Sequence, residues 1–215
     1  MRRVLMIGVL SFGWMSQSAV AQTYDGCSTD QVEIIDDALR AAKALTLKAA
    51  VTIGDTPDYS RWFGAYSDAN AEKARANLKA IVAAIRGGGV TAQCDVIAQD
   101  GCAQGEYAWV RPDEPYHIHL CPSFFQLPPL ARLQPGTRRS ANGTREGTIV
   151  HEVSHFSYVA QTSDHCYSRT ECTDMAQTDV QRAITNADSY QYFTEDVTYF
   201  ARQPIANKPP PAPRK

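Results

Sequence analysis

The chain has 215 residues, of which 44% are hydrophobic and 20% charged, and its formal net charge is -2 at pH 7. This composition is typical of a folded globular protein and excludes an intrinsically disordered chain. Without a large excess of lysine and arginine, nucleic acid is not an expected partner. The length suits a single domain with a sizeable core.

The first 21 residues have the pattern of a secretory signal peptide. Arg2 and Arg3 precede an apolar run over residues 4–15, and Ala19-Val20-Ala21 supplies the small residues of a cleavage site. A run of about 12 apolar residues is too short to span a bilayer. We therefore expect secretion to the periplasm or the extracellular space, with no membrane contact.

Two helices are predicted in the first part of the remaining chain. Residues 28–52 begin with Ser28 and Gln31 at capping-box spacing and continue with apolar residues at helical spacing. Residues 68–86 end at a run of three glycines, which stops a helix. Between the helices, the aromatic segment 59–69 is expected to be a turn packed on the core.

The middle of the chain predicts a small antiparallel sheet. Three short segments are rich in aromatic and β-branched residues and are bounded by Gly, Pro and Asp, namely 90–98, 106–112 and 116–125. After a loop over 126–143, helices are predicted near 148–158, 172–185 and 188–202. Residues 204–215 form a Pro-rich flexible tail. The pattern indicates one predominantly helical α+β domain over residues 22–203.

Six cysteines follow the expected cleavage point, at Cys27, Cys94, Cys102, Cys121, Cys166 and Cys172. An even number in an oxidising compartment predicts up to three disulfides. Proximity in the sequence favours Cys166 with Cys172 and Cys102 with Cys121, which leaves Cys27 with Cys94. A zinc–thiolate cluster is disfavoured because the chain has no CxxC pair.

His151, Glu152 and His155 form an HExxH motif inside the predicted helix 148–158. Residues four apart lie one turn apart on the same helix face, so both imidazoles can reach one zinc ion. Glu152 is rotated off that face, where it can take a proton from a metal-activated water. Apolar residues flank the motif, so we expect a buried helix, in which unpartnered polar side chains would be costly.

A catalytic zinc site usually has a third protein ligand, and the residues leave several candidates. The HExxHxxGxxH pattern is absent, because Tyr158 and Gln161 stand at its glycine and its last histidine. A straight helix would carry Asp164 about 13 Å along its axis from His155, so this ligand requires a chain reversal near Gln161. The candidates are Asp164, His165, Glu171 and Glu195.

The region resembles the aspzincin metallopeptidases, the family of deuterolysin and the peptidyl-Lys metalloendopeptidases. The family pattern is HExxH followed by GTxDxxYG, and here HEVSH is followed by QTSDHCYS. Thr162, Asp164 and Tyr167 match in register, whereas Gln161 and Ser168 replace the two glycines. The segments RWFGAYSDA, YHIHLCPSFF and NADSYQYF also look like family segments, so the likeness covers most of residues 55–200.

The resemblance implies a zincin-like fold with one Zn²⁺ per chain, bound by His151, His155 and Asp164. It implies that Glu152 is the general base and that the Tyr167 hydroxyl stabilises the oxyanion that develops on the substrate carbonyl. The two missing glycines put the geometry of the turn in question, not the identity of the ligands.

The resemblance also implies that Asp188 lines a pocket for a lysine after the scissile bond, with Gln191 in place of a second acidic residue. Losing one carboxylate is expected to weaken that selectivity. The alternative role for Asp188 is a helix N-cap. We therefore expect a secreted, monomeric zinc metalloendopeptidase acting on proteins or peptides. The alternatives are a zinc-containing binding or effector domain without proteolytic activity, and a disulfide-rich structural protein without metal.

Overall fold

The computed structural model describes residues 22–86, 89–94, 101–103, 105–134, 137 and 141–199. The expected signal peptide and the Pro-rich tail lie outside these residues. The helices are α1 (Thr29–Thr52), α2 (Pro57–Phe63), α3 (Asp68–Arg86), α4 (Arg145–His155), α5 (Arg169–Thr178), α6 (Val180–Ile184) and α7 (Ala187–Thr198). The strands are β1 (Thr23–Asp25), β2 (Thr91–Cys94), β3 (Ala108–Val110) and β4 (His117–Leu120), and two 3-10 turns follow, η1 (Phe124–Gln126) and η2 (Leu130–Arg132).

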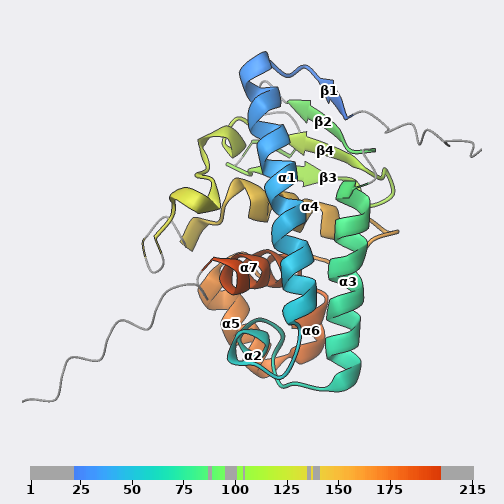
Figure 1. The fold of residues 1–215 in the computed structure, drawn as a ribbon, viewed down its shortest axis with the longest axis vertical. Helices are drawn as coiled ribbons and strands as arrows, with labels where there is room; N and C mark the ends of the chain where they lie inside the picture. The colour runs from blue at the N-terminus through green and yellow to red at the C-terminus, as the bar shows by residue number, and fades with distance from the viewer. Residues whose placement is uncertain are drawn as a thin grey trace, which may run out of the picture.

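The long helices α1 and α3 pack side by side along the molecule, with the sheet near one end and α2, α5 and α6 near the other (Figure 1). Both match their predicted ranges. The capping box of α1 is present, with Ser28 and Gln31 each bonding the other's backbone N–H. The segment 59–69, expected to be an aromatic turn, instead overlaps α2, which is capped by Thr56 and begins with Pro57.

The fold class is confirmed as predominantly helical α+β, but the sheet is mixed where an antiparallel one was expected. Its order is β1-β2-β4-β3, and only β3 and β4 pair antiparallel. Parallel pairs need long crossover connections. Helices α1 to α3 connect β1 with β2, and the segment containing β3 connects β2 with β4, so both pairs become parallel.

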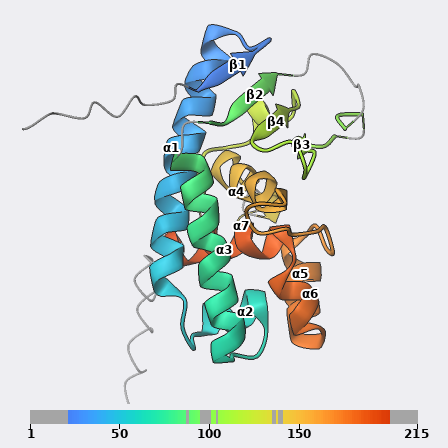
Figure 2. The ribbon, with the colours of Figure 1, turned by 90° about the vertical axis from the view of Figure 1, so that its right-hand side faces the viewer.

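Helix α4 lies between the sheet and α7, near the centre of the molecule (Figure 2). It packs against α1, α3, α7 and β3. Its apolar residues Ile149, Val150 and Val153 are fully buried, as the sequence predicted for a core helix. The apolar face therefore fixes the position of the helix and of the polar side chains that it carries.

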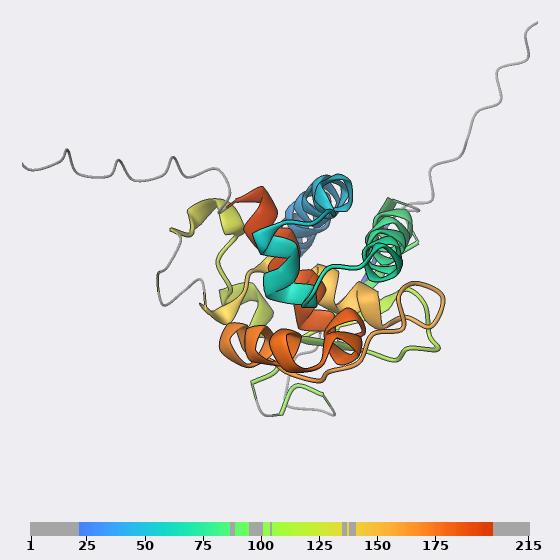
Figure 3. The same cartoon turned by 90° about the horizontal axis from the view of Figure 1, so that it is seen from below.

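The segment 172–185, expected to be one helix, forms two. Asp179 ends α5 and caps α6, because its carboxylate accepts a hydrogen bond from the Arg182 N–H at 3.1 Å. Seen from below, α5 and α6 lie on the opposite side of α2 from α1 (Figure 3). The chain after the HExxH helix thus folds back beneath α4 before it enters α7.

All three predicted disulfides are present: Cys27–Cys94, Cys102–Cys121 and Cys166–Cys172. The first joins the start of α1 to β2, and the second joins the loop before β3 to the end of β4. The third closes a short loop into α5. Within the described ranges, no helix is both long and apolar enough to cross a membrane.

Candidate metal centre

Helix α4 sets the position of the two motif histidines. The Thr144 hydroxyl caps the helix by accepting from the Gly147 N–H at 2.9 Å, and a side chain at Gly147 would collide with Glu195 of α7. The helix ends at His155, three residues before the predicted end. On one face, Nε2 of His151 and Nε2 of His155 lie 3.1 Å apart.

The chain reversal that Asp164 requires occurs where the sequence predicted it. Gln161 has φ 50°, a left-handed conformation that turns the chain back along α4. Thr162 then bonds Ser154 twice, from its backbone N–H to the Ser154 carbonyl at 3.1 Å and between the two hydroxyls at 2.6 Å. These contacts bring Asp164 to the histidine face.

His151, His155 and Asp164 form a nearly equilateral triangle of donor atoms. Oδ1 of Asp164 lies 3.2 Å from Nε2 of His151 and 3.3 Å from Nε2 of His155. Ligands at 2.0–2.1 Å from a tetrahedral zinc ion are separated by about 3.3 to 3.4 Å. The three residues therefore fit zinc in spacing and in donor chemistry.

The outer nitrogens of both imidazoles are already bonded. Nδ1 of His155 donates to the Thr162 carbonyl at 2.9 Å, and Nδ1 of His151 donates to Oδ1 of Asp188 at 2.7 Å. Each ring thus carries its proton on Nδ1 and directs the lone pair of Nε2 toward the other ligands. This is the tautomer that a metal-binding histidine needs.

Glu152 lies in the same cleft as the triangle and is only 5% exposed. Burial raises the pKa of its carboxyl above the ordinary value, while His151 and His155 act in the opposite direction. A carboxylate with a raised pKa is a better proton acceptor near neutral pH. The cleft therefore holds a buried carboxylate with a raised pKa beside the three candidate ligands.

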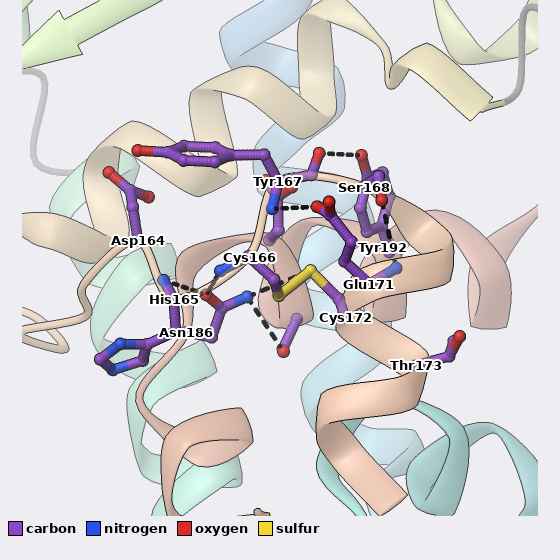
Figure 4. The surroundings of a disulfide bond; sticks show 12 residues. Asp164, His165, Cys166, Tyr167, Ser168, Glu171, Cys172, Thr173, Asn186 and Tyr192 are labelled. Carbon is purple, nitrogen blue, oxygen red and sulfur yellow. Dashed lines mark hydrogen bonds between the residues drawn. A yellow bond between two sulfur atoms is a disulfide. The ribbon is translucent and has the colours of Figure 1, made fainter.

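Tyr167 projects from the turn after Asp164, and its ring extends toward the Asp164 carboxylate (Figure 4). The side chain is largely exposed, at 67%. Its main chain is held on both sides: the N–H donates to Glu171 at 3.4 Å, and the carbonyl accepts from the Tyr192 hydroxyl at 3.3 Å. Partial burial of the phenol, followed by the nearby Asp164, raises its pKa, so the hydroxyl stays protonated and can donate a hydrogen bond.

The two positions that lack the family glycines behave differently. Ser168 is in an extended conformation, with φ −121°, and its hydroxyl caps α5 by accepting from the Glu171 N–H at 3.1 Å. Glycine is not needed there. Gln161 does occupy the left-handed region in which glycine is favoured, so the turn keeps its shape at a conformational cost.

The other candidates for the third ligand are engaged elsewhere. The Glu195 carboxylate is buried and bonds Arg169 at 2.5 Å and Thr144 at 2.8 Å. His165 bonds the Thr185 hydroxyl at 3.2 Å, and Glu171 accepts from the Tyr167 N–H. Over the part of the chain that the structure describes, the one cluster with metal-ligand spacing consists of His151, His155 and Asp164.

Asp188 contacts a candidate metal ligand, a role that the sequence did not suggest. It is 4% exposed and bonds a candidate metal ligand, His151. The N-cap alternative is wrong, because Asn186 occupies the N-cap of α7. Gln191 lies in the same cleft, one turn further along the helix, and is 6% exposed.

The cleft has a volume of about 730 Å³, and the residues that line it include the donor triangle, Glu152, Tyr167, Asp188 and Gln191. One wall is formed by β3 and the loop before it, and the other by α4 and α7. Sequence reasoning missed Asn186, whose buried carboxamide accepts from the N–H groups of His165 and Cys166 and so holds the ligand turn. It also missed Arg169 and Tyr192; the family-like segment NADSYQYF, which includes Asn186 and Tyr192, was the available signal.

Comparisons with known proteins identify the family of this chain. The profile of the Aspzincin family, described as lysine-specific metallo-endopeptidase, matches residues 48–195. An extracellular protease of Aeromonas hydrophila is 36% identical over 174 residues, which are 79% of this chain and 46% of the relative. A peptidyl-Lys metalloendopeptidase of Armillaria mellea is 26% identical over 88% of this chain and 50% of its own length.

Among solved structures, a zinc peptidase from Grifola frondosa has the same fold, with a TM-score of 0.67. The two chains are 24% identical, and the match covers 80% of this chain and 98% of that one. This chain spans about half the length of the first curated relatives it matches, 46% of one and 50% of another.

Proposed function

Since this chain belongs to the aspzincin family of metallo-endopeptidases, we propose that it is a secreted, zinc-dependent endopeptidase. The observation that carries the proposal is the triangle of donor atoms, with sides of 3.1, 3.2 and 3.3 Å, next to a buried carboxylate. In this proposal His151, His155 and Asp164 bind one Zn²⁺ per chain. When bound, the ion would act as a Lewis acid that polarises a peptide carbonyl and lowers the pKa of water.

The protein's own groups then act on the peptide bond. Glu152 accepts a proton from the attacking water and delivers it to the leaving amine. The Tyr167 hydroxyl donates a hydrogen bond to the substrate carbonyl oxygen as negative charge develops on it. Both side chains line the cleft that holds the three ligands.

An extended peptide suits the wall formed by β3. This strand is at the end of the described sheet, and its residues Ala108, Trp109 and Val110 line the cleft. A peptide can add to such an edge through main-chain hydrogen bonds, which are independent of its sequence. Proteins and peptides are therefore the proposed substrates, and the proposed active unit is a monomer.

A preference for lysine after the scissile bond is the finer part of the proposal. Asp188 lines the cleft and is the carboxylate that the family resemblance assigns to attract an ammonium group. One of its oxygens already accepts from His151, and Gln191 adds no charge. We therefore propose a modest preference for lysine, not a strict one.

Secretion is supported by three disulfides within the described residues, because such bonds persist in oxidising compartments. We propose that residues 1–21 are a signal peptide, that residues 22–203 form the peptidase domain and that residues 204–215 are a flexible tail.

A digest of an unbiased peptide library with the purified chain, with and without a zinc chelator, tests the proposal. Cleavage that the chelator abolishes and added zinc restores is the expected result, and the cut sites report the preference for lysine. A chain that binds one zinc ion but cuts no peptide would be the non-proteolytic binding domain instead. A chain that binds no zinc would be neither a zinc peptidase nor a zinc-containing binding domain.

A further inference from the structure

The Arg169 side chain points inward although it is at the first turn of α5. Only 20% of it is exposed. Its guanidinium bonds two carboxylates of α7, Glu195 at 2.5 Å and Asp196 at 2.7 Å. It also lies over two aromatic rings, with Cζ 4.4 Å from the centroid of Tyr192 and 5.4 Å from that of Trp62. A planar cation with several donors suits such a site better than an ammonium.

The two carboxylates connect Arg169 to the rest of the fold. Glu195 also accepts from Thr144, the cap of the HExxH helix, at 2.8 Å. Asp196 also accepts from the indole N–H of Trp62 in α2, at 2.8 Å. Both carboxylates are nearly fully buried, with side-chain exposures of 1% and 6%. Arg169 therefore compensates buried charge where α2, α4, α5 and α7 meet.

Arg169 is also linked to the proposed oxyanion donor in two ways. It follows Tyr167 by two residues, and the Tyr192 ring beneath its guanidinium carries the hydroxyl that bonds the Tyr167 carbonyl. Because the Tyr167 side chain is 67% exposed, the position of its hydroxyl depends largely on its main chain. The Cys166–Cys172 disulfide ties this turn to α5, and Arg169 ties α5 to α7.

We propose that Arg169 is a positioning residue for Tyr167. By bonding α7, it fixes the turn that carries the phenol, so that the hydroxyl stays close to the candidate metal ligands. This inference rests on the proposed function and extends it to a residue that does not touch the substrate. It predicts that a change at Arg169 acts through Tyr167 and not through the metal.

Arg169→Lys is the informative variant, because it keeps the charge but loses the fork of donors and the stacking. We expect kcat for a library-derived peptide to fall about tenfold, a coupling typical of residues in one network. KM and the zinc content should stay at the wild-type values. Arg61→Lys is the matched control, since Arg61 approaches the same Asp196 at 3.6 Å but is half exposed. It should leave kcat unchanged.

A double-mutant cycle separates positioning from a general structural role. If Arg169 acts through Tyr167, Arg169→Lys should cause no further loss of kcat in a Tyr167→Phe background. An equal loss in both backgrounds, or wild-type kcat in Arg169→Lys alone, would overturn the inference. Tyr192→Phe, which keeps the ring but loses the bond to the Tyr167 carbonyl, gives a second cycle should Arg169→Lys fold poorly.

Amide hydrogen exchange over residues 164–168 gives a readout that does not need activity. Exchange there should be faster in Arg169→Lys than in the wild type and unchanged in Arg61→Lys; equal exchange in all three proteins would overturn the inference. If the wild-type chain cuts no peptide, the proposed function fails, while the exchange measurement still decides whether Arg169 holds this turn.

Discussion

Asp188 and His151 are 37 residues apart in the sequence, yet Oδ1 of Asp188 lies 2.7 Å from Nδ1 of His151. The Asp188 side chain is 6% exposed, so little water weakens this hydrogen bond. Such a partner fixes the orientation of the imidazole and makes Nε2 a stronger donor to a metal. Helix α7 thereby contributes to a candidate site whose proposed ligands all precede it in the sequence.

The first prediction is that Asp188→Asn weakens zinc binding. An amide preserves the size of the side chain but is a poorer acceptor for the Nδ1 proton, so the zinc affinity should fall about 10- to 100-fold. Competition with a chromophoric chelator measures this change. Asp37→Asn, at an exposed acidic residue on α1, is a control that should leave the affinity unchanged.

Asp188→Asn also separates the two roles of this residue. If zinc affinity is unchanged and only the preference for lysine is lost, Asp188 is a substrate residue and its bond to His151 is incidental. Loss of both properties indicates that one carboxylate serves the metal ligand and the substrate.

The second prediction is that Asp164→Ala removes zinc. It deletes one vertex of the donor triangle and leaves two histidines, which hold zinc far more weakly than three protein ligands. Metal analysis after gel filtration should find close to one zinc ion per chain in the wild type and little in the variant. His165→Gln, at the neighbouring residue that bonds Thr185, should keep the metal. If His165→Gln loses zinc and Asp164→Ala keeps it, Asp164 is not the third ligand.

The third prediction is that Glu152→Gln keeps zinc and loses proteolysis. Glutamine fills the same space but cannot accept the proton of the attacking water, and a general base contributes about 10²- to 10⁴-fold to the rate. Initial rates on a fluorogenic peptide, normalised to bound zinc, measure the effect. Activity close to that of the wild type would require a different base.

The fourth prediction is that Gln161→Gly stabilises the fold. The left-handed conformation costs a residue with a Cβ about 1 kcal/mol or more, and glycine avoids this cost. Part of the gain is offset because glycine also gives the unfolded chain more freedom. Urea unfolding of the zinc-loaded protein should give a higher midpoint for Gln161→Gly. Gln161→Ala keeps the strain and should show no such increase; equal shifts in both variants would locate the effect elsewhere.

Local signals in the sequence predicted the elements that are determined locally. The capping box at Ser28 and the three glycines after Arg86 defined the ends of α1 and α3, and both ranges agree with the structure. The HExxH spacing indicated one helix face, and the polar segment after Tyr158 indicated the reversal that brings in Asp164. The disulfides followed from sequence proximity and elimination.

The remaining features depend on contacts between distant segments. The directions of the strands follow from how the connecting segments cross the sheet, so short strand-like segments could not predict a mixed sheet. Helix α2 has seven residues, too few for a clear periodicity. Asn186, Arg169 and Tyr192 act through hydrogen bonds to residues about 14 to 27 positions away in the sequence. No local sequence pattern predicts such bonds.

The contacts of α7 also bear on the order in which the chain is synthesised. Both motif histidines, the proposed base and Asp164 precede residue 170, whereas Asn186, Asp188, Tyr192 and Glu195 lie in or next to α7. A nascent chain that stops before Ala187 therefore carries the candidate ligands without the helix that orients His151. Because domains fold as units, we expect the candidate site to be completed only when α7 has docked. Chains shortened to end before Ala187 are therefore expected to lack an ordered centre, although they contain all three candidate ligands.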